Sequence, residues 1–290
     1  MLAKAPQAPT GRGLRPLNVL LVANRKDHGA HEHDYPRWLE RWKVLLSGKG
    51  SVPATMYGLT ADLPAGPNPG APGVKVETAA DWPTSAQLQR ADVVVAFMGT
   101  GGIWNEARLR DLKALLDRGA GFVALHSAVI AEKPHAKPLA ELLGLAWEGG
   151  HTLFRHGPLD LKIGAPSHPI TRGLPEHIHF EDETYWPLVG DVSRVNVLAT
   201  AEEAMPGTGR LAPQPMFWTH TAGKGRVFNS ILGHYTWTFD DPYFRILVLR
   251  GMAWAAGESP YRFDPLVLAG ARVTDRKPVV TKVAVAAPIA

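Results

Sequence analysis

Residues 91–127 read ADVVVAFMGTGGIWNEARLRDLKALLDRGAGFVALHS, and this stretch decides the fold. Two apolar runs, at 92–98 and 121–125, each have the length of a strand, and the segment between them has leucines at helical spacing. Asn105 can cap that helix, and Gly119 follows its end. A strand, a helix and a second strand in this order are typical of a parallel sheet with helices packed on its faces.

The same alternation of strand and helix extends toward the N-terminus. Residues 18–23 are a continuous apolar run, and a helix is predicted from its cap at Asp34 to a stop at Gly48. A short strand at 74–77 and a short helix at 85–90 connect this unit to the next strand. The chain is therefore predicted to be an α/β protein with a doubly wound, mostly parallel sheet.

After residue 135 the pattern is weaker but still contains apolar segments. It predicts a helix at 137–143 and strands at 159–163, 194–200, 215–219 and 225–232. An apolar helix follows, with Asp240 or Asp241 as its cap, Pro242 in its first turn and Gly257 after its end. We expect this last helix to pack on the sheet.

Three segments fall outside this pattern. Residues 1–16, rich in proline, glycine and arginine, are predicted to be a flexible leader, and the proline- and glycine-rich residues 51–73 a loop or lid. Residues 17–257 then form one domain. Residues 258–290 are expected to be either an arm that reaches over a neighbouring subunit of a homo-oligomer or a disordered tail.

Composition excludes several classes of protein. The 31 Lys and Arg against 27 Asp and Glu give a net charge of only +4, and the basic residues are scattered singly, so nucleic acid is not an expected partner. The chain has no cysteine, which excludes a thiolate nucleophile, a disulfide or a zinc–thiolate site. No apolar stretch approaches the ~18 residues of a membrane span. We expect a soluble, cytoplasmic protein.

Ligands of such sheets bind beyond the carboxyl ends of the strands, so the residues that follow each strand are the candidates for a site. The loop after the first strand contains His28, His31 and His33 together with several carboxylates, residue types that ligate metals, although their spacing matches no established ligand motif. The alternative is a solvated loop in which Asp34 only caps the next helix.

A second candidate is the loop Gly99-Thr100-Gly101-Gly102. Its backbone N–H groups precede a helix and suit an oxyanion or a sugar hydroxyl, although a simple turn would have the same composition. The loop has neither the dinucleotide fingerprint nor a Walker lysine, which disfavours a nicotinamide oxidoreductase.

His126 directly follows the strand at 121–125, where α/β enzymes expose a nucleophile, and Ser127 is a secondary candidate. His234 follows the strand at 225–232 in the same way, and we predict that it pairs with His126. A structural role for each histidine is the alternative.

Three adjacent carboxylates, Glu181, Asp182 and Glu183, lie beside Tyr185. Crowding raises a carboxyl pKa if the groups are partly buried, which would suit a general acid or base. If they are exposed, they form only an acidic loop. Several aromatic residues near predicted loops suit either stacking on sugar faces or core packing: Trp104, Trp147, Tyr185, Trp186, Trp218 and Trp237.

Several motifs occur in an order that resembles the ThuA-like (trehalose utilisation) family, whose fold is that of class I glutamine amidotransferases. They are GFVALHSA at 121–128, SHPITRGLP at 167–175, DETY at 182–185, FWTH at 217–220, GKGRVF at 223–228, LGH at 232–234 and the helix at 244–257. Each motif alone is unspecific, but their shared order across about residues 17–257 indicates the family.

The resemblance implies a flavodoxin-like sheet. It also implies that His126 occupies the elbow where an amidotransferase carries its cysteine, and that His234 lies near the position of the triad histidine. Amidotransferase chemistry is excluded, because the chain has no cysteine. The family is linked to disaccharide use, including the oxidation of a glycoside to a 3-keto sugar, which implies a sugar substrate.

The leading hypothesis is an enzyme of carbohydrate catabolism, a lyase, isomerase or hydrolase, that acts on a glycoside or its 3-keto derivative by acid–base chemistry. The rival hypothesis is a non-catalytic carbohydrate-binding or regulatory protein. The predicted catalytic residues are His126, His234, Glu183, Asp182 and Tyr185. Predicted substrate contacts are His28, His31, Gly101, Gly102, Ser127, Trp186 and Trp218, and a divalent Zn, Mn, Fe or Ni ion would be held by His28, His126 and His234.

Overall fold

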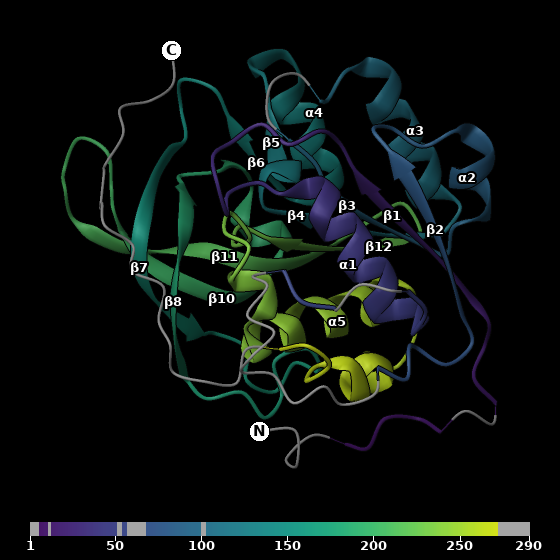
Figure 1. The fold of residues 1–290 in the computed structure, drawn as a ribbon. Coiled ribbons are helices and arrows are strands. Elements are labelled where there is room, and N and C mark those ends of the chain that lie inside the picture. The colour runs from purple at the N-terminus through teal and green to yellow at the C-terminus, as the bar shows by residue number, and fades with distance from the viewer. Residues whose placement is uncertain (1–5, 11–12, 51–53, 57–67, 100–102, 272–290) are drawn as a thin grey trace.

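The computed structural model describes residues 6–10, 13–50, 54–56, 68–99 and 103–271. Its centre is a nine-stranded sheet in the order β2-β1-β3-β4-β12-β11-β10-β7-β8, with helices on both faces (Figure 1). The sheet has a parallel half and an antiparallel half, and the candidate site lies where the two halves meet.

The parallel half consists of β1 (Leu17–Ala23), β2 (Val74–Ala80), β3 (Val93–Phe97), β4 (Gly121–Leu125) and β12 (Gly225–Ser230). With β1 between β2 and β3, this is the strand order of a flavodoxin-like sheet. Every residue of β3 and β4 is buried, because helices cover both faces, and these strands therefore read as continuous apolar runs. The predicted α/β, doubly wound fold is confirmed.

The helices divide between the two faces. Helices α1 (Tyr35–Ser47) and α5 (Pro242–Ala255) cover one face, and α2 (Ser85–Arg90), α3 (Glu106–Asp117) and α4 (Lys133–Leu143) cover the other (Figure 1). The predicted caps of the major helices are present. Asp34, Asn105 and Asp241 each accept a hydrogen bond from a backbone N–H in the first turn of α1, α3 and α5, respectively.

The antiparallel half consists of β7 (Leu153–Ile163), β8 (His177–Trp186), β10 (Asn196–Ala204) and β11 (Leu211–Ala222). Three of these strands extend beyond the predicted segments: β7 begins earlier, at Leu153, and β10 and β11 continue to Ala204 and Ala222. Strand β8 was not predicted at all. The alternative of an exposed acidic loop at 181–183 is therefore wrong, since these residues lie in β8, where Asp182 and Glu183 are buried.

The junction between β10 and β7 is narrow. Only two residue pairs, Ala199 with Ile163 and Thr200 with Lys162, join these strands. Strands β7 and β8 consequently stand across the direction of β10 and β11 rather than continuing beside them (Figure 1). Because β7 and β8 run in this different direction, the end of β8 lies near the carboxyl ends of the parallel strands.

Short elements complete the described chain. Strands β5 (Ile130–Ala131), β6 (Leu145–Glu148) and β9 (Val189–Gly190) form a separate three-stranded sheet. Helix α4 begins at Lys133, four residues before the predicted start, with Pro134 in its first turn. The 3-10 helices are His126–Val129, Val192–Arg194, Thr238–Asp240 and Pro260–Leu266.

The segments predicted to lie outside the domain differ from one another. Residues 6–10 and 13–16 form no helix or strand, and β1 begins at Leu17, one residue before the predicted strand. The described parts of the loop at 51–73, residues 54–56 and 68–73, contain no regular element. In contrast, the 3-10 helix Pro260–Leu266 packs against α5, so this portion of the expected arm belongs to the folded domain.

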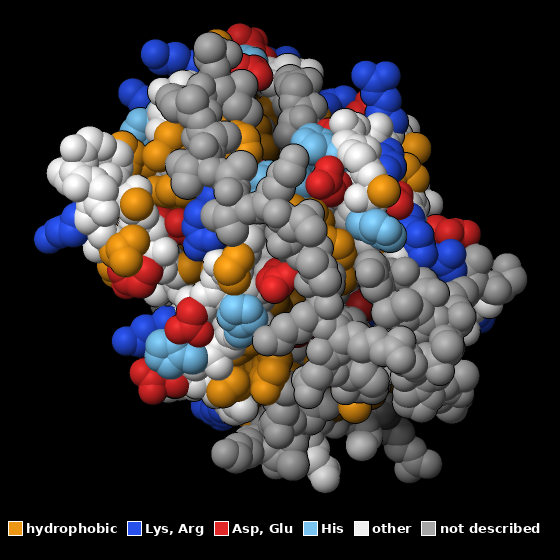
Figure 2. Space-filling model, turned by 60° about the vertical axis from the view of Figure 1, so that its left-hand side comes forward, with side chains coloured by type: hydrophobic (Ala, Val, Ile, Leu, Met, Phe, Trp, Pro, Cys, Tyr) orange, Lys and Arg blue, Asp and Glu red, His pale blue; other side chains and the backbone are white. Residues whose placement is uncertain are grey.

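On the face shown in Figure 2, Lys and Arg side chains lie singly among acidic, histidine and apolar side chains. This distribution agrees with the scattered basic residues of the sequence. Within the described ranges, none of the helices combines the length and apolar character that crossing a membrane requires.

Candidate active site

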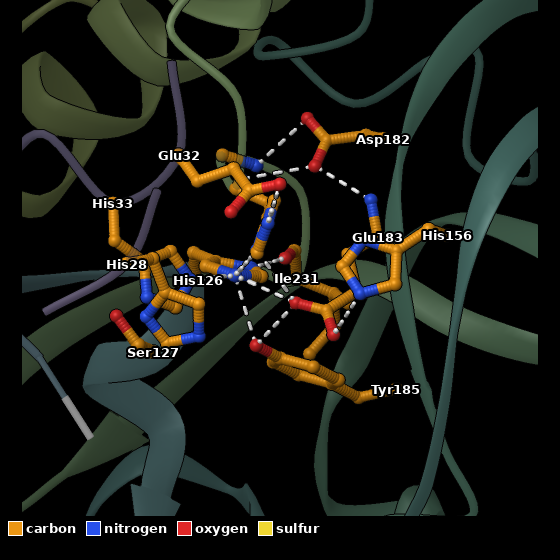
Figure 3. Close-up of polar contacts among 12 residues, drawn as sticks. His28, Glu32, His33, His126, Ser127, His156, Asp182, Glu183, Tyr185 and Ile231 are labelled. Atoms are coloured by element: carbon orange, nitrogen blue, oxygen red, sulfur yellow. Dashed lines mark hydrogen bonds and ion pairs between the residues drawn. The ribbon is translucent and has the colours of Figure 1, made fainter. Parts of the chain in front are cut away.

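Four chain segments bring polar side chains together beyond the carboxyl ends of the parallel strands (Figure 3). The loop after β1 contributes His33, the turn after β4 contributes His126, and the loop after β12 contributes His234. Strand β8 contributes Glu183 and Tyr185 from the antiparallel half. The predicted pairing of His126 with His234 is present, and all five side chains are buried.

His126 is the centre of this cluster. Its backbone has a positive φ of 51°, a conformation that is uncommon outside glycine and typical of tight strand-to-helix turns. The Nδ1–H donates to the carbonyl of Ile231 at 2.6 Å, so the ring presents Nε2 to the site. Four polar atoms surround Nε2: Tyr185 Oη at 2.8 Å, His33 Nε2 at 2.9 Å, Glu183 Oε2 at 3.1 Å and His234 Nδ1 at 3.3 Å.

Glu183 is the carboxylate of the cluster. Its Oε2 lies 2.9 Å from Nδ1 of His234 and accepts a hydrogen bond from Tyr185 at 3.0 Å. Burial alone would raise the pKa of Glu183, but the charge of His234 and the contacts with His234 and His126 hold this pKa well below its usual range. Glu183 is therefore ionised in this arrangement.

His234 lies between two carboxylates. Burial opposes its charged form, but Glu183 on one side and Glu32, 3.9 Å from Nε2, on the other raise the pKa of His234 to about 9. The same contact lowers the pKa of Glu32 to about 2. His234 is thus a cation at neutral pH in this arrangement.

Asp182 points away from the cluster, because successive residues of a strand face opposite sides. Its carboxylate accepts backbone N–H bonds from Glu183 at 2.7 Å, His234 at 2.9 Å and Gly233 at 3.1 Å. Burial, not crowding by neighbouring carboxylates, raises the pKa of Asp182. Asp182 therefore holds the loop that carries His234, which is a positioning role rather than the predicted catalytic one.

The loop after β1 places its histidines at different depths. His33 is buried, with Nδ1 3.0 Å from Asp27 Oδ1, and burial lowers the pKa of His33 to about 3 despite that carboxylate. His28 lies 2.7 Å from the same oxygen but is nearer the surface. His31 lies outside the cluster, with its ring centroid 6.4 Å from that of Trp237.

Several predicted substrate contacts lie elsewhere. Ser127 is buried beneath the cluster, where its hydroxyl contacts Tyr35 and the carbonyl of Met98. Trp186 and Trp218 are buried with their Nε1–H groups bonded to backbone carbonyls, so they are core residues without a face for a sugar. Gly101 and Gly102 lie outside the described residues.

Two histidines of the site, His33 and His156, were not selected from the sequence. His33 was noted in its loop but not selected, although its place directly before the helix cap Asp34 fixes where the loop rejoins α1. His156 lies on β7 opposite Glu183, with Nε2 3.4 Å from Oε1 of that carboxylate. No local signal identifies His156, because its pairing spans two strands and a long connection.

The family model described as Trehalose utilisation, ThuA, matches residues 27–255. A ThuA-like protein from Parabacteroides merdae ATCC 43184 is 20% identical, covers 95% of this chain and 99% of its own, and superposes with a TM-score of 0.58. A second, from Bacteroides uniformis ATCC 8492, is 17% identical over 87% of this chain and 98% of its own, with a TM-score of 0.59. These two likenesses show the fold. No curated protein matches the sequence. The family match confirms the resemblance predicted from the motifs, and this chain belongs to the ThuA family.

Proposed function

We propose that this chain is an enzyme of carbohydrate metabolism that transfers protons on a glycoside or disaccharide, or on its 3-keto derivative. The observation that carries the proposal is the convergence of Glu183, Tyr185 and His126 within about 3 Å at the carboxyl ends of the parallel strands. Buried ionisable groups with perturbed pKa values at such a position are typical of active sites. The family description, trehalose utilisation, supports a sugar as substrate.

The site separates a base from an acid. Glu183 is ionised, whereas burial and the adjacent Glu183 carboxylate raise the pKa of Tyr185 well above its ordinary value, so that Tyr185 keeps its proton. Two titratable groups whose environments move their pKa values apart are suited to act as base and acid. The cationic His234 adds a positive charge beside them.

These groups fit the chemistry of a 3-keto sugar. Hydrogens on the carbons next to a ketone are acidic, and Glu183 would accept one of them. Negative charge then develops on the carbonyl oxygen, where Tyr185 and His234 would donate hydrogen bonds. The resulting enolate leads to elimination, in which the group at the next carbon leaves, or to isomerisation, in which a proton returns at another position.

A partly exposed rim surrounds the buried groups. The side chains of His28, Glu32 and His156 are 37%, 32% and 22% exposed, and all three face the cluster (Figure 3). We propose that substrate approaches past this rim, where hydroxyl groups find both donors and acceptors.

The first test is turnover. We expect the purified protein to convert a 3-keto disaccharide and, in D2O, to introduce deuterium beside the carbonyl, as followed by NMR. Glu183→Gln and Tyr185→Phe should each lower kcat by about 10²- to 10⁴-fold, the usual contribution of a general acid or base. Glu176→Gln makes the same chemical change at an exposed position and should leave kcat unchanged.

Saturable sugar binding without turnover of any glycoside or 3-keto sugar in the panel would overturn the proposal. That outcome would favour a non-catalytic carbohydrate-binding or regulatory protein. If Glu183→Gln still converts the sugar, the protein is an enzyme, but Glu183 is not part of its mechanism.

A further inference from the structure

We propose that His33, His126, His234 and Glu183 bind one divalent transition-metal ion. The inference deepens the proposed function, on which its catalytic meaning rests, because it concerns the same site. With the ion bound, His234 would lose its proton and become a ligand, and the ion would replace it in stabilising the carbonyl oxygen. Glu183 would offer the ion one of its two oxygens. Metal binding itself is measured without any sugar. The ligand set differs from the one predicted from the sequence: His33 takes the place of His28, and Glu183 is added.

The first argument is geometry. One ligand atom from each of the four buried residues lies within 4.8 Å of all the others. The recorded separations run from 2.9 Å, between Glu183 Oε2 and His234 Nδ1, to 3.3 Å, between His234 Nδ1 and His126 Nε2. Ligands about 2.0–2.2 Å from a tetrahedral metal lie about 3.3–3.6 Å apart. A shift of a few tenths of an ångström per side chain therefore makes room for the ion.

The second argument is the placement of protons. His126 Nδ1 faces the carbonyl of Ile231, and His33 Nδ1 faces the carboxylate of Asp27, so each Nδ1 is the protonated donor. In the neutral rings both Nε2 atoms then carry lone pairs, yet these atoms lie 2.9 Å apart. A cation coordinated by both atoms relieves this repulsion. A shared proton is the competing explanation.

The third argument is that groups able to accept a hydrogen bond lie behind the proposed histidine ligands. Histidines that bind metals donate their second N–H to a carboxylate or a backbone carbonyl, which fixes the tautomer and the ring orientation. Asp27 serves His33 in this way, the Ile231 carbonyl serves His126, and Glu32 lies 3.9 Å from the outer nitrogen of His234. Two of the three histidines thus have a hydrogen-bond partner on the side away from the cluster, and the third has a carboxylate nearby.

The donor set indicates the class of metal. Three imidazole nitrogens and one carboxylate oxygen suit Zn²⁺, Fe²⁺, Co²⁺, Ni²⁺ or Mn²⁺, whereas Mg²⁺ and Ca²⁺ prefer oxygen ligands alone. Glu183 supplies one negative charge to offset the two positive charges of the ion. His28 is left to contact Asp27 at the rim.

The test uses the untagged full chain, stripped with a chelator and dialysed against Zn²⁺ or Co²⁺. We expect about one ion per chain by elemental analysis, and the visible absorption of four-coordinate Co²⁺. His33→Gln and Glu183→Gln should abolish this stoichiometric binding. His177→Gln removes an exposed histidine and should bind as wild type does. Asp27→Asn should weaken affinity by about 10- to 100-fold, as expected for an outer partner.

Variants that fail to fold, judged by circular dichroism, are replaced in the comparison by Asp27→Asn, which alters no proposed ligand. Folded wild-type protein that binds neither ion, or binding that persists in folded His33→Gln and Glu183→Gln, would overturn the metal site. Sugar turnover by chelated protein would support the proposed function and would show that the ion takes no part in the reaction. Bound metal without turnover of any sugar would overturn only the proposed function.

Discussion

A single hydrogen bond determines which atom of His126 faces the site. Its Nδ1–H donates to the carbonyl of Ile231, so Nε2 is presented to Glu183 and Tyr185. A ring rotated by 180° would leave that buried carbonyl without its donor, at a cost of about 1–3 kcal/mol. The loop after β12 therefore both carries His234 and selects the working nitrogen of His126.

The pH dependence of stability is testable at His168, which lies outside the cluster. Burial lowers the pKa of His168, and its Nδ1 accepts the backbone N–H of Ile170 at 3.2 Å. A histidine whose folded pKa lies below its unfolded value costs stability as the pH falls through the unfolded value, about 6.5, because the unfolded chain binds the proton more tightly. We expect His168→Asn, which retains an acceptor, to lose less stability than wild type between pH 7 and pH 5.

Urea denaturation at several pH values measures this difference. An exposed histidine, His177, provides the control, since His177→Asn should keep the pH dependence of wild type. If the free energy of unfolding changes with pH equally in wild type and His168→Asn, then His168 does not contribute to the pH dependence of stability.

At the scale of elements, α5 connects the sheet to the residues that follow it. The sequence predicted a broad apolar face for this helix, yet Arg250 is buried within it. Its guanidinium forms two 2.9 Å bonds with Asp264 and also donates to the carbonyls of Ile170 and Arg172. One side chain thus joins α5, the 3-10 helix Pro260–Leu266 and the turn at 167–175, which explains why residues 258–271 belong to the domain.

Removing one partner of the Arg250–Asp264 ion pair should lower the stability of the protein. Asp264→Ala leaves the Arg250 guanidinium buried without its carboxylate, and we expect a loss of about 3–5 kcal/mol in the free energy of unfolding. Arg250→Met with Asp264→Leu removes both charges and should cost less than the sum of the two single changes. Equilibrium urea denaturation compares wild type, Asp264→Ala, Arg250→Met, Asp264→Leu and the double variant. A loss below 1 kcal/mol for Asp264→Ala would contradict this account.

The parallel half was predictable from sequence because its signals are local. An apolar run gives β4, and the caps Asn105 and Asp34 fix the starts of two helices within a few residues. Strand β8 has no such signal. Its buried half contains Asp182 and Glu183, and carboxylates are unfavourable inside a sheet unless distant partners satisfy them.

The candidate site was predictable only in part, for the same reason. His126 and His234 follow apolar strands, so their positions in the chain indicate the shared edge of the sheet. Among the histidines of the first loop, however, the depth of each ring depends on tertiary contacts such as the bond between His33 N and the carbonyl of His234. No spacing rule distinguishes His33 from His28.

At the scale of the molecule, the candidate site joins the two halves of the sheet. The parallel half supplies His33, His126 and His234, and β8 supplies Glu183 from the antiparallel half. Within the antiparallel half, only two residue pairs join β7 to β10, so contacts at the site add to the connection between β8 and the parallel half. A ligand held by both halves should therefore stabilise both at once.

Hydrogen exchange can detect this coupling if the proposed metal binds. We expect Zn²⁺ to slow amide exchange in the loop at 28–34, in the loop at 231–236 and in residues 181–185 of β8, because opening of any one of these segments would release a ligand. Exchange in α2, which lies away from the site, should change far less. Glu183→Gln should lose the protection in all three segments together. Protection confined to the parallel half would show that β8 does not share the ion, and the antiparallel half would then have no part in metal binding.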